Sequence, residues 1–210
     1  MVKYTKDYVT KHFKGIIVII MFLIFISLLE DVLENEIMSI DVYMYRFAVD
    51  FLRSDWLTPI MEFFTFVGSA YVIIGICVLS LLFIKDKKIG LIICGNAAMI
   101  TIINQLMKRI VQRPRPSGSY LLVNESGYSF PSGHSMVSMA FYSLLIYLIY
   151  RSNLNKKIKI TLSVILVITI IMIGLSRIYL GAHYASDVIA GFSISLVYLY
   201  IIIKHIIQLD

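Results

Sequence analysis

Three polar residues capable of acid–base chemistry lie at fixed intervals between two long apolar runs in the last quarter of the chain. The segment SRIYLGAHYASD, residues 176–187, contains Arg177, His183 and Asp187. If a helix begins near Ala182, His183 and Asp187 share one face four residues apart, and the carboxylate can hold the imidazole in one tautomer. An oriented, basic histidine can serve as a nucleophile or a general base.

A second segment, KRIVQRPRP at residues 108–116, supplies further positive charge. Lys108 and Arg115 are seven residues apart, and a proline closes the segment. Lysine carries a compact charge, whereas arginine presents a planar fork of donors. With Arg177, these cations suit a phosphate dianion whose oxygens point in several directions.

A third segment, PSGH at residues 131–134, has the residue types of a helix start. Ser132 is placed as an N-cap, and Gly133 allows a ligand to approach closely. The free N–H groups of such a helix N-terminus would point at the same anion. His134 comes from a different helix than His183, so it can be the acid that protonates a departing oxygen.

The composition indicates which elements must position these residues. The 210 residues are 59% hydrophobic and only 15% charged, with a mean hydropathy of +0.85, which excludes an ordinary soluble domain. A membrane-spanning helix needs roughly 20 mostly apolar residues. We therefore predict an all-α membrane protein forming a single domain over residues 1–210, with six transmembrane helices at about 14–33, 57–84, 89–107, 132–150, 158–175 and 185–203.

The distribution of lysine and arginine predicts the orientation of these helices. Alternating six spans places both termini, residues 85–88 and residues 151–157 with the adjoining Lys159 on one side, and that side carries 12 of the 19 basic residues. Both termini are then expected in the cytoplasm and the three polar segments on the outer face. The net charge of +6 is mainly this topological signal and does not indicate nucleic-acid binding.

A short amphipathic helix is predicted between the first two spans. Apolar residues recur there at helical spacing, and charged residues fall opposite to them: Ile37, Ile40, Met44, Phe47, Ala48 and Phe51 against Arg46, Asp50 and Arg53. Such a helix would lie in the outer membrane interface. A structural lid or collar is the favoured interpretation, and a part in admitting substrate is the alternative.

The remaining polar residues of the spans and loops have simpler interpretations. Cys77 and Cys94 lie inside predicted spans and are interpreted as packing residues, with no disulfide or metal site. Arg109 and Arg113 are interpreted as anchors at the headgroup level. Asn104 is expected to pack between helices, although it could also brace the lysine four residues later.

In order and spacing, the three segments resemble the three signature motifs of the type-2 phosphatidic acid phosphatase family, whose site is shared with vanadium haloperoxidases. The resemblance implies a phosphatase that needs no metal and no other cofactor. His183 would attack phosphorus to form a phosphohistidine, Asp187 would orient it and His134 would protonate the leaving group. The phosphate-binding residues implied by the motifs are Lys108, Arg115, Ser132, Gly133 and Arg177.

The position of the site at the outer headgroup level favours a lipid phosphate over a soluble one. Undecaprenyl pyrophosphate, phosphatidylglycerol phosphate and phosphatidic acid all present a terminal phosphate, and the sequence does not choose among them. A non-catalytic transporter or binding protein for anionic lipids is the alternative; it would need the cations but not the His183–Asp187 pair. A soluble haloperoxidase fits less well, although vanadate should inhibit as a phosphate mimic.

Overall fold

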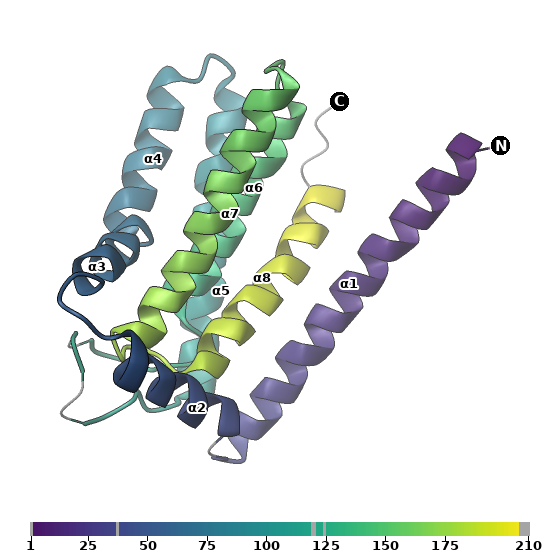
Figure 1. Cartoon of the computed structure of the whole chain (residues 1–210). Coiled ribbons are helices and arrows are strands. Elements are labelled where there is room, and N and C mark those ends of the chain that lie inside the picture. Colours follow the sequence, from purple (N-terminus) through teal and green to yellow (C-terminus); the bar gives the residue numbers. More distant parts are fainter. Residues whose placement is uncertain (1, 37, 119–120, 124, 206–210) are drawn as a thin grey trace.

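The computed structural model in Figure 1 is a bundle of helices, with no strand in the part of the chain that it describes. It describes residues 2–36, 38–118, 121–123 and 125–205, and their side chains from residue 13 onward. The helices are α1 (Val2–Leu33), α2 (Ser39–Phe47), the π-helical turn η1 (Ala48–Leu52), α3 (Thr58–Val67), α4 (Ala70–Phe83), α5 (Lys87–Val111), α6 (Gly133–Arg151), α7 (Lys156–Tyr179) and α8 (Ala185–His205).

The predicted membrane-spanning architecture is confirmed. Five helices, α1, α5, α6, α7 and α8, are long and apolar enough to cross a membrane, and the bent pair α3 and α4, counted as one span, is a sixth. Cys77 in α4 and Cys94 in α5 are both free thiols. The lysines of the first eleven residues, on which the predicted orientation partly rests, lie on part of α1 whose side chains are outside the described residues.

The second span is broken, which the sequence did not indicate. α3 and α4 meet at an angle of 45°. Gly68 ends α3, and Ser69 has extended backbone angles before α4 begins. A Cβ at Gly68 would lie 2.7 Å from a methyl group of Ile173 and 3.3 Å from the ring of His134. The break therefore brings the backbone of this span against α7 and against a histidine of the PSGH segment.

The centre of the bundle is α6, which packs against α5, α7 and α8, while α1 lies along α8 at the edge. The largest apolar cluster, which includes Ile93, Phe141 and Ile173, joins α4, α5, α6 and α7. Large apolar side chains of α1, α4 and α7 are exposed on the outside, as expected for surfaces that face lipid.

The predicted amphipathic helix exists as α2 and η1, but one residue of its predicted polar face, Arg53, is bonded to the bundle. Phe51, on the predicted apolar face, is 78% exposed, as a side chain directed at lipid would be, and Asp41, which no sequence pattern marks, is the most deeply buried polar residue of α2. Arg53, predicted to face water, donates hydrogen bonds to the Tyr179 carbonyl oxygen, the shorter at 3.0 Å. Ile37 lies outside the described residues. α2 is thus bonded to the ends of α7 and α8 by polar contacts.

All three polar segments lie at one end of the bundle, the end that α2 crosses in Figure 1. The end of α5 and the start of α6 approach this end from either side of a long loop, and a tight turn joins α7 to α8. Gly181 adopts a left-handed φ of 76° in this turn, a conformation that other residues rarely adopt. The N–H groups of Ala182 and His183 then bond to the Arg177 carbonyl oxygen.

Candidate active site

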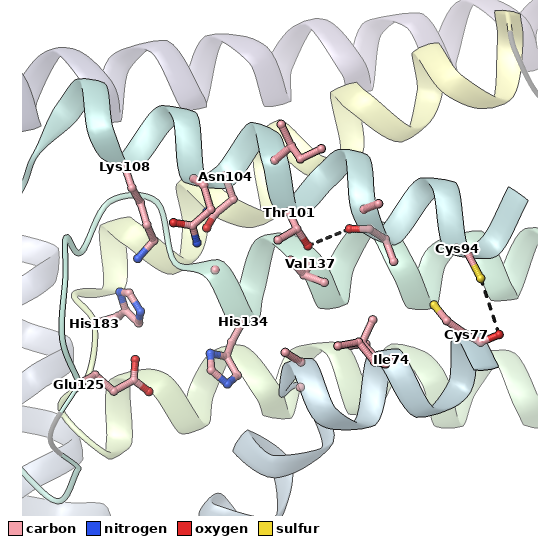
Figure 2. Close-up of a pocket in the computed structure, with 18 of the residues that line it drawn as sticks. Ile74, Cys77, Cys94, Thr101, Asn104, Lys108, Glu125, His134, Val137 and His183 are labelled. Carbon is pink, nitrogen blue, oxygen red and sulfur yellow. Dashed lines mark hydrogen bonds between the residues drawn. The ribbon is translucent and has the colours of Figure 1, made fainter. Parts of the chain in front are cut away.

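A cavity of about 650 Å³ opens at this end of the bundle, and the polar residues of the three segments gather around it. Lys108 reaches it from α5, His134 from the start of α6 and His183 from the turn before α8, as Figure 2 shows. Arg115 and Glu125 enter from the α5–α6 loop. The fold therefore brings together residues that are up to 75 positions apart in the sequence.

The predicted His183–Asp187 pair is formed at the edge of the cavity. His183 Nδ1 lies 3.3 Å from Asp187 Oδ2, and its Nε2 lies 3.2 Å from Arg115 Nη1. Because a guanidinium can only donate, Nε2 must accept, and the proton therefore resides on Nδ1. The lone pair of Nε2 therefore points to Arg115, which also lines the cavity, and the carboxylate of Asp187 lies at Nδ1 on the other side of the ring.

The environment of His183 favours the neutral imidazole. Its side chain is almost fully buried, and this burial lowers the pKa of His183 to about 4, although Asp187 acts in the opposite direction. The positive charges of Arg177 and Arg115 lower it further. Since the pKa lies well below 7, the imidazole keeps its lone pair at neutral pH and can act as a nucleophile.

Two cations, Lys108 and Arg115, line the cavity, and a third, Arg177, lies beneath its surface and is joined to Arg115 through Glu125. Lys108 is buried in α5 and donates to the Tyr128 carbonyl oxygen at 2.5 Å. Arg115 donates to the Ala182 carbonyl oxygen at 2.9 Å. Arg177 is fully buried and donates to Thr65 Oγ1 at 2.9 Å, and within the described part of the chain its Nε has no partner. Such a buried, incompletely paired group of cations favours an anionic ligand.

Glu125, which the sequence analysis missed, joins two of these cations. Its carboxylate forms an ion pair with Arg177 and lies 3.2 Å from Arg115 Nη1. Burial by itself raises the pKa of Glu125, but Arg177, His134 and Arg115 outweigh it and lower the pKa to about 2. The carboxylate thus contributes a permanent negative charge between the arginines.

The PSGH segment begins α6 as predicted, and its residues differ in what they contact. Ser132 is the N-cap, and its Oγ accepts from Ser135 N at 3.5 Å and from Ser135 Oγ at 2.9 Å. Its hydroxyl is buried in these contacts and does not line the cavity, whereas Gly133 and His134 do. Asn104 donates to the Pro131 carbonyl oxygen at 3.1 Å, so it fixes this segment to α5 and does not bond to Lys108.

The interpretation of Arg113 as a headgroup anchor is wrong. Its guanidinium is largely buried and bridges two carboxylates, Asp187 at 2.6 Å and Asp41 at 2.8 Å. Arg109, one turn earlier on α5, is exposed, as an anchor would be. In the sequence, both arginines are basic residues at the end of the same predicted span. They point in different directions because α5 ends between them, at Gln112, where the backbone takes a left-handed φ of 54°.

The cavity continues from the polar end into an apolar channel between α4 and α5. Its walls there include Ile74, Thr101 and Val137, and it extends as far as Cys77 and Cys94 (Figure 2). A ligand with a phosphate at one end and a hydrocarbon chain at the other matches this division. Within the described residues, no group of three His, Cys, Asp or Glu side chains is arranged to hold a metal ion.

These features define a helical membrane protein with a buried anion site and an oriented histidine, as in an enzyme of phosphate transfer. Residues 89–208 match the model of the PAP2 superfamily. The chain is 30% identical to phosphatidylglycerophosphatase B of Bacillus subtilis over 87% of its length and 91% of that protein. It is 25% identical to an undecaprenyl-diphosphatase of Sulfolobus acidocaldarius, over 83% and 82% of the two chains.

The fold is similar as well. A crystal structure of a transmembrane PAP2-type phosphatidylglycerolphosphate phosphatase from Bacillus subtilis superimposes with a TM-score of 0.81, at 27% identity, over 92% of this chain and 98% of that one. The chain therefore belongs to the PAP2 superfamily, and the relatives compared are membrane lipid phosphatases. The alternative of a non-catalytic anionic-lipid transporter receives no support from these relatives.

Replacing the negative charge of Glu125 should strengthen anion binding. In Glu125→Gln, no carboxylate competes for Arg115 and Arg177, so orthovanadate should bind about tenfold more tightly, roughly the worth of one partly buried ion pair. Titration calorimetry on the detergent-purified protein measures this directly. Glu62→Gln, which removes an exposed carboxylate of α3, is the matched control and should bind as the parent does. Weaker binding in Glu125→Gln would instead mean that Glu125 holds the arginines in their binding positions.

Proposed function

We propose that the chain removes the terminal phosphate from a lipid phosphate or lipid pyrophosphate by covalent catalysis at His183. The observation that carries the proposal is the orientation of this imidazole. Nδ1 is engaged by Asp187, and Nε2 faces a cavity with cations on one side and an apolar channel on the other. A binding protein would use the cations and the channel, but it has no use for an oriented imidazole lone pair.

In the first step the phosphate binds to Lys108, Arg115 and Arg177, and Nε2 of His183 attacks phosphorus. The N–P bond forms as the P–O bond to the lipid breaks, and His134 gives its proton to the departing oxygen. The imidazole becomes positively charged as it is phosphorylated, and Asp187 stabilises that charge. The cations stabilise the charge on the transferring phosphoryl oxygens.

In the second step water attacks the phosphohistidine. His134, now neutral, accepts a proton from the water, the N–P bond breaks, and inorganic phosphate leaves with the original imidazole restored. The bond from Arg115 to His183 Nε2 has to be exchanged for a bond to the phosphate before the first step can begin. The free N–H groups at the start of α6, beside Gly133, are further donors for the phosphate.

The apolar channel between α4 and α5 is proposed to receive the acyl or prenyl chain of the substrate. Phosphatidylglycerol phosphate, undecaprenyl pyrophosphate and phosphatidic acid share the required chemistry, a terminal phosphate on a lipid whose chain remains in the bilayer. The names of the relatives, a phosphatidylglycerophosphatase and an undecaprenyl-diphosphatase, support this class of substrate. The charge of the site comes from Lys108, Arg115 and Arg177, so catalysis is proposed to need no metal.

The site is proposed to face the outside of the cell, with both termini in the cytoplasm, because 12 of the 19 basic residues belong to the opposite end of the bundle. Ser117 is exposed in the α5–α6 loop and suits a test. Ser117→Cys should react with an impermeant maleimide added to intact cells, whereas the parent chain, with Cys77 and Cys94 inside spans, should not. If an active variant reacts only after the cells are lysed, the site faces the cytoplasm and the proposed orientation is wrong.

The two histidines are distinguished by substrates whose leaving groups differ in basicity. His183→Ala should be inactive on every substrate, because no phosphoenzyme can form. His134→Ala should lose about 10² to 10⁴ in turnover on phosphatidic acid, whose alkoxide needs a proton, and should recover on a prenyl pyrophosphate and on an aryl phosphate with an acidic phenol. Phosphate release is measured for both variants on all three substrates, with EDTA present throughout.

Equal losses of turnover by His134→Ala on all three substrates would mean that His134 is a structural or phosphate-binding residue. If His183→Ala instead regained activity along the series, His183 would be the general acid and His134 the nucleophile. Parent activity that disappears in EDTA and returns with magnesium would overturn the metal-free mechanism.

A further inference from the structure

The buried carboxylate of Asp187 has three partners besides the histidine. Its Oδ2 accepts from the backbone N–H of Tyr184 at 3.0 Å and from the hydroxyl of Ser129, and it faces His183 Nδ1. Its Oδ1 accepts from Arg113 Nη1 at 2.6 Å. A full positive charge therefore lies directly behind the carboxylate that orients the imidazole.

Arg113 is held in this position from three sides. Its Nη2 donates to Asp41 Oδ2 at 2.8 Å, and its guanidinium lies over the ring of Tyr184, 4.1 Å from the ring centre. Asp41, only 4% exposed, also accepts from Ser186 N at 2.8 Å and from Ser186 Oγ at 2.7 Å. The helix α2 thereby contributes a charged residue to the network behind the site.

We propose that Arg113 and Asp41 are positioning residues that set the basicity of His183 through Asp187, with Asp41 cancelling the charge of Arg113. The inference rests on the proposed nucleophilic role of His183 and adds two residues that touch neither the substrate nor the reacting atoms. It gives α2 a function in catalysis, beyond that of a collar around the bundle.

The argument is one of charge. Asp41, Arg113 and Asp187 lie in a row joined by hydrogen bonds, and their sum is one negative charge. An unbalanced Arg113 would neutralise Asp187 and leave little to stabilise a positively charged imidazole. Burial by itself lowers the pKa of Arg113, but the two carboxylates outweigh it and raise the pKa above its ordinary value, so the guanidinium stays charged.

Other charged or titratable groups also act on His183 and stay the same in the comparison below. They come from every element packed around it: Lys108 on α5, Arg115 and Glu125 on the α5–α6 loop, His134 on α6, Arg177 on α7, and Tyr184 next to it in the chain. Substitutions at Arg113 and Asp41 leave these groups in place.

The two residues are predicted to act in opposite directions. Arg113→Gln changes the sum of the row from one negative charge to two, which stabilises the imidazolium and raises the pKa of His183. Asp41→Asn changes the sum to zero and lowers that pKa. Because the nucleophile must be neutral, kcat/KM falls as the pH drops through this pKa, and the acid limb of its pH profile reports it for the free enzyme.

The experiment measures kcat/KM between pH 3.5 and 8 on a short-chain phosphatidic acid in detergent micelles. The acid limb of Arg113→Gln should move up by about one pH unit, the lower end of the shift that a neighbouring charge produces. Asp41→Asn should move it down, and the double variant Arg113→Gln/Asp41→Asn, whose sum is again one negative charge, should return it to the parent position. The upward shift of the acid limb in Arg113→Gln, and its reversal in the double variant, both fall between pH 3.5 and 8.

Two controls separate charge from shape. Arg113→Lys keeps the charge but loses the two-pronged geometry, so it should lower kcat and leave the acid limb at the parent pH. Arg109→Gln removes an equal charge from an exposed position one turn earlier on α5 and should move nothing. If Asp41→Asn is not recovered as a folded protein, Arg113→Gln against Arg113→Lys decides the question alone.

Losses of kcat in Arg113→Gln with an unmoved acid limb, or equal shifts in Arg113→Gln and Arg113→Lys, would overturn the inference and leave the network a structural one. A parent enzyme that releases no phosphate from any lipid phosphate would overturn the proposed function, which is a separate result.

Discussion

The carboxylate of Asp187 is a negative charge with no exposed surface in a protein built mainly of apolar helices. A buried charge is tolerated only where donors replace its hydration. Here the donors come from the α7–α8 turn and from the α5–α6 loop, and Asp41 of α2 accepts from the same Arg113 that donates to Asp187. Satisfying this one group fixes the relative positions of the segments that form the site. The Ser132 N–H, which bonds to the backbone oxygen of Asp187, adds the start of α6 to the same arrangement.

The anion site presents the reverse problem. Lys108, Arg115 and Arg177 lie close enough to repel one another, and their burial leaves little water to screen them. In the structure, backbone carbonyl oxygens and the carboxylate of Glu125 offset part of that repulsion. A phosphate dianion would offset it more completely, and the apolar channel would accommodate the chain attached to it. Repulsion among the cations thus favours binding of the substrate.

The spans, the three polar segments and the His183–Asp187 pair were predictable because each is a local pattern of hydropathy or spacing. Glu125 was not predictable, because a single carboxylate in a loop has no period and its partners are fixed only by the fold. Arg113 and Asp41 were missed for a related reason: a charged residue at the membrane boundary is usually solvated, and its burial depends on how α2 lies across the bundle. The break at Gly68 was missed because its neighbours are as apolar as those of an unbroken span.

The central claim is that phosphate passes through a covalent bond to Nε2 of His183, and trapping that intermediate tests it most directly. The purified protein would be mixed with a ³²P-labelled lipid phosphate, quenched in alkali within milliseconds, and digested for mass spectrometry. The account predicts a label that is stable in alkali and lost in acid, on the peptide that contains His183, and absent from His183→Ala. A label on another residue, or a His183→Ala variant that still releases phosphate at the parent rate, would contradict it.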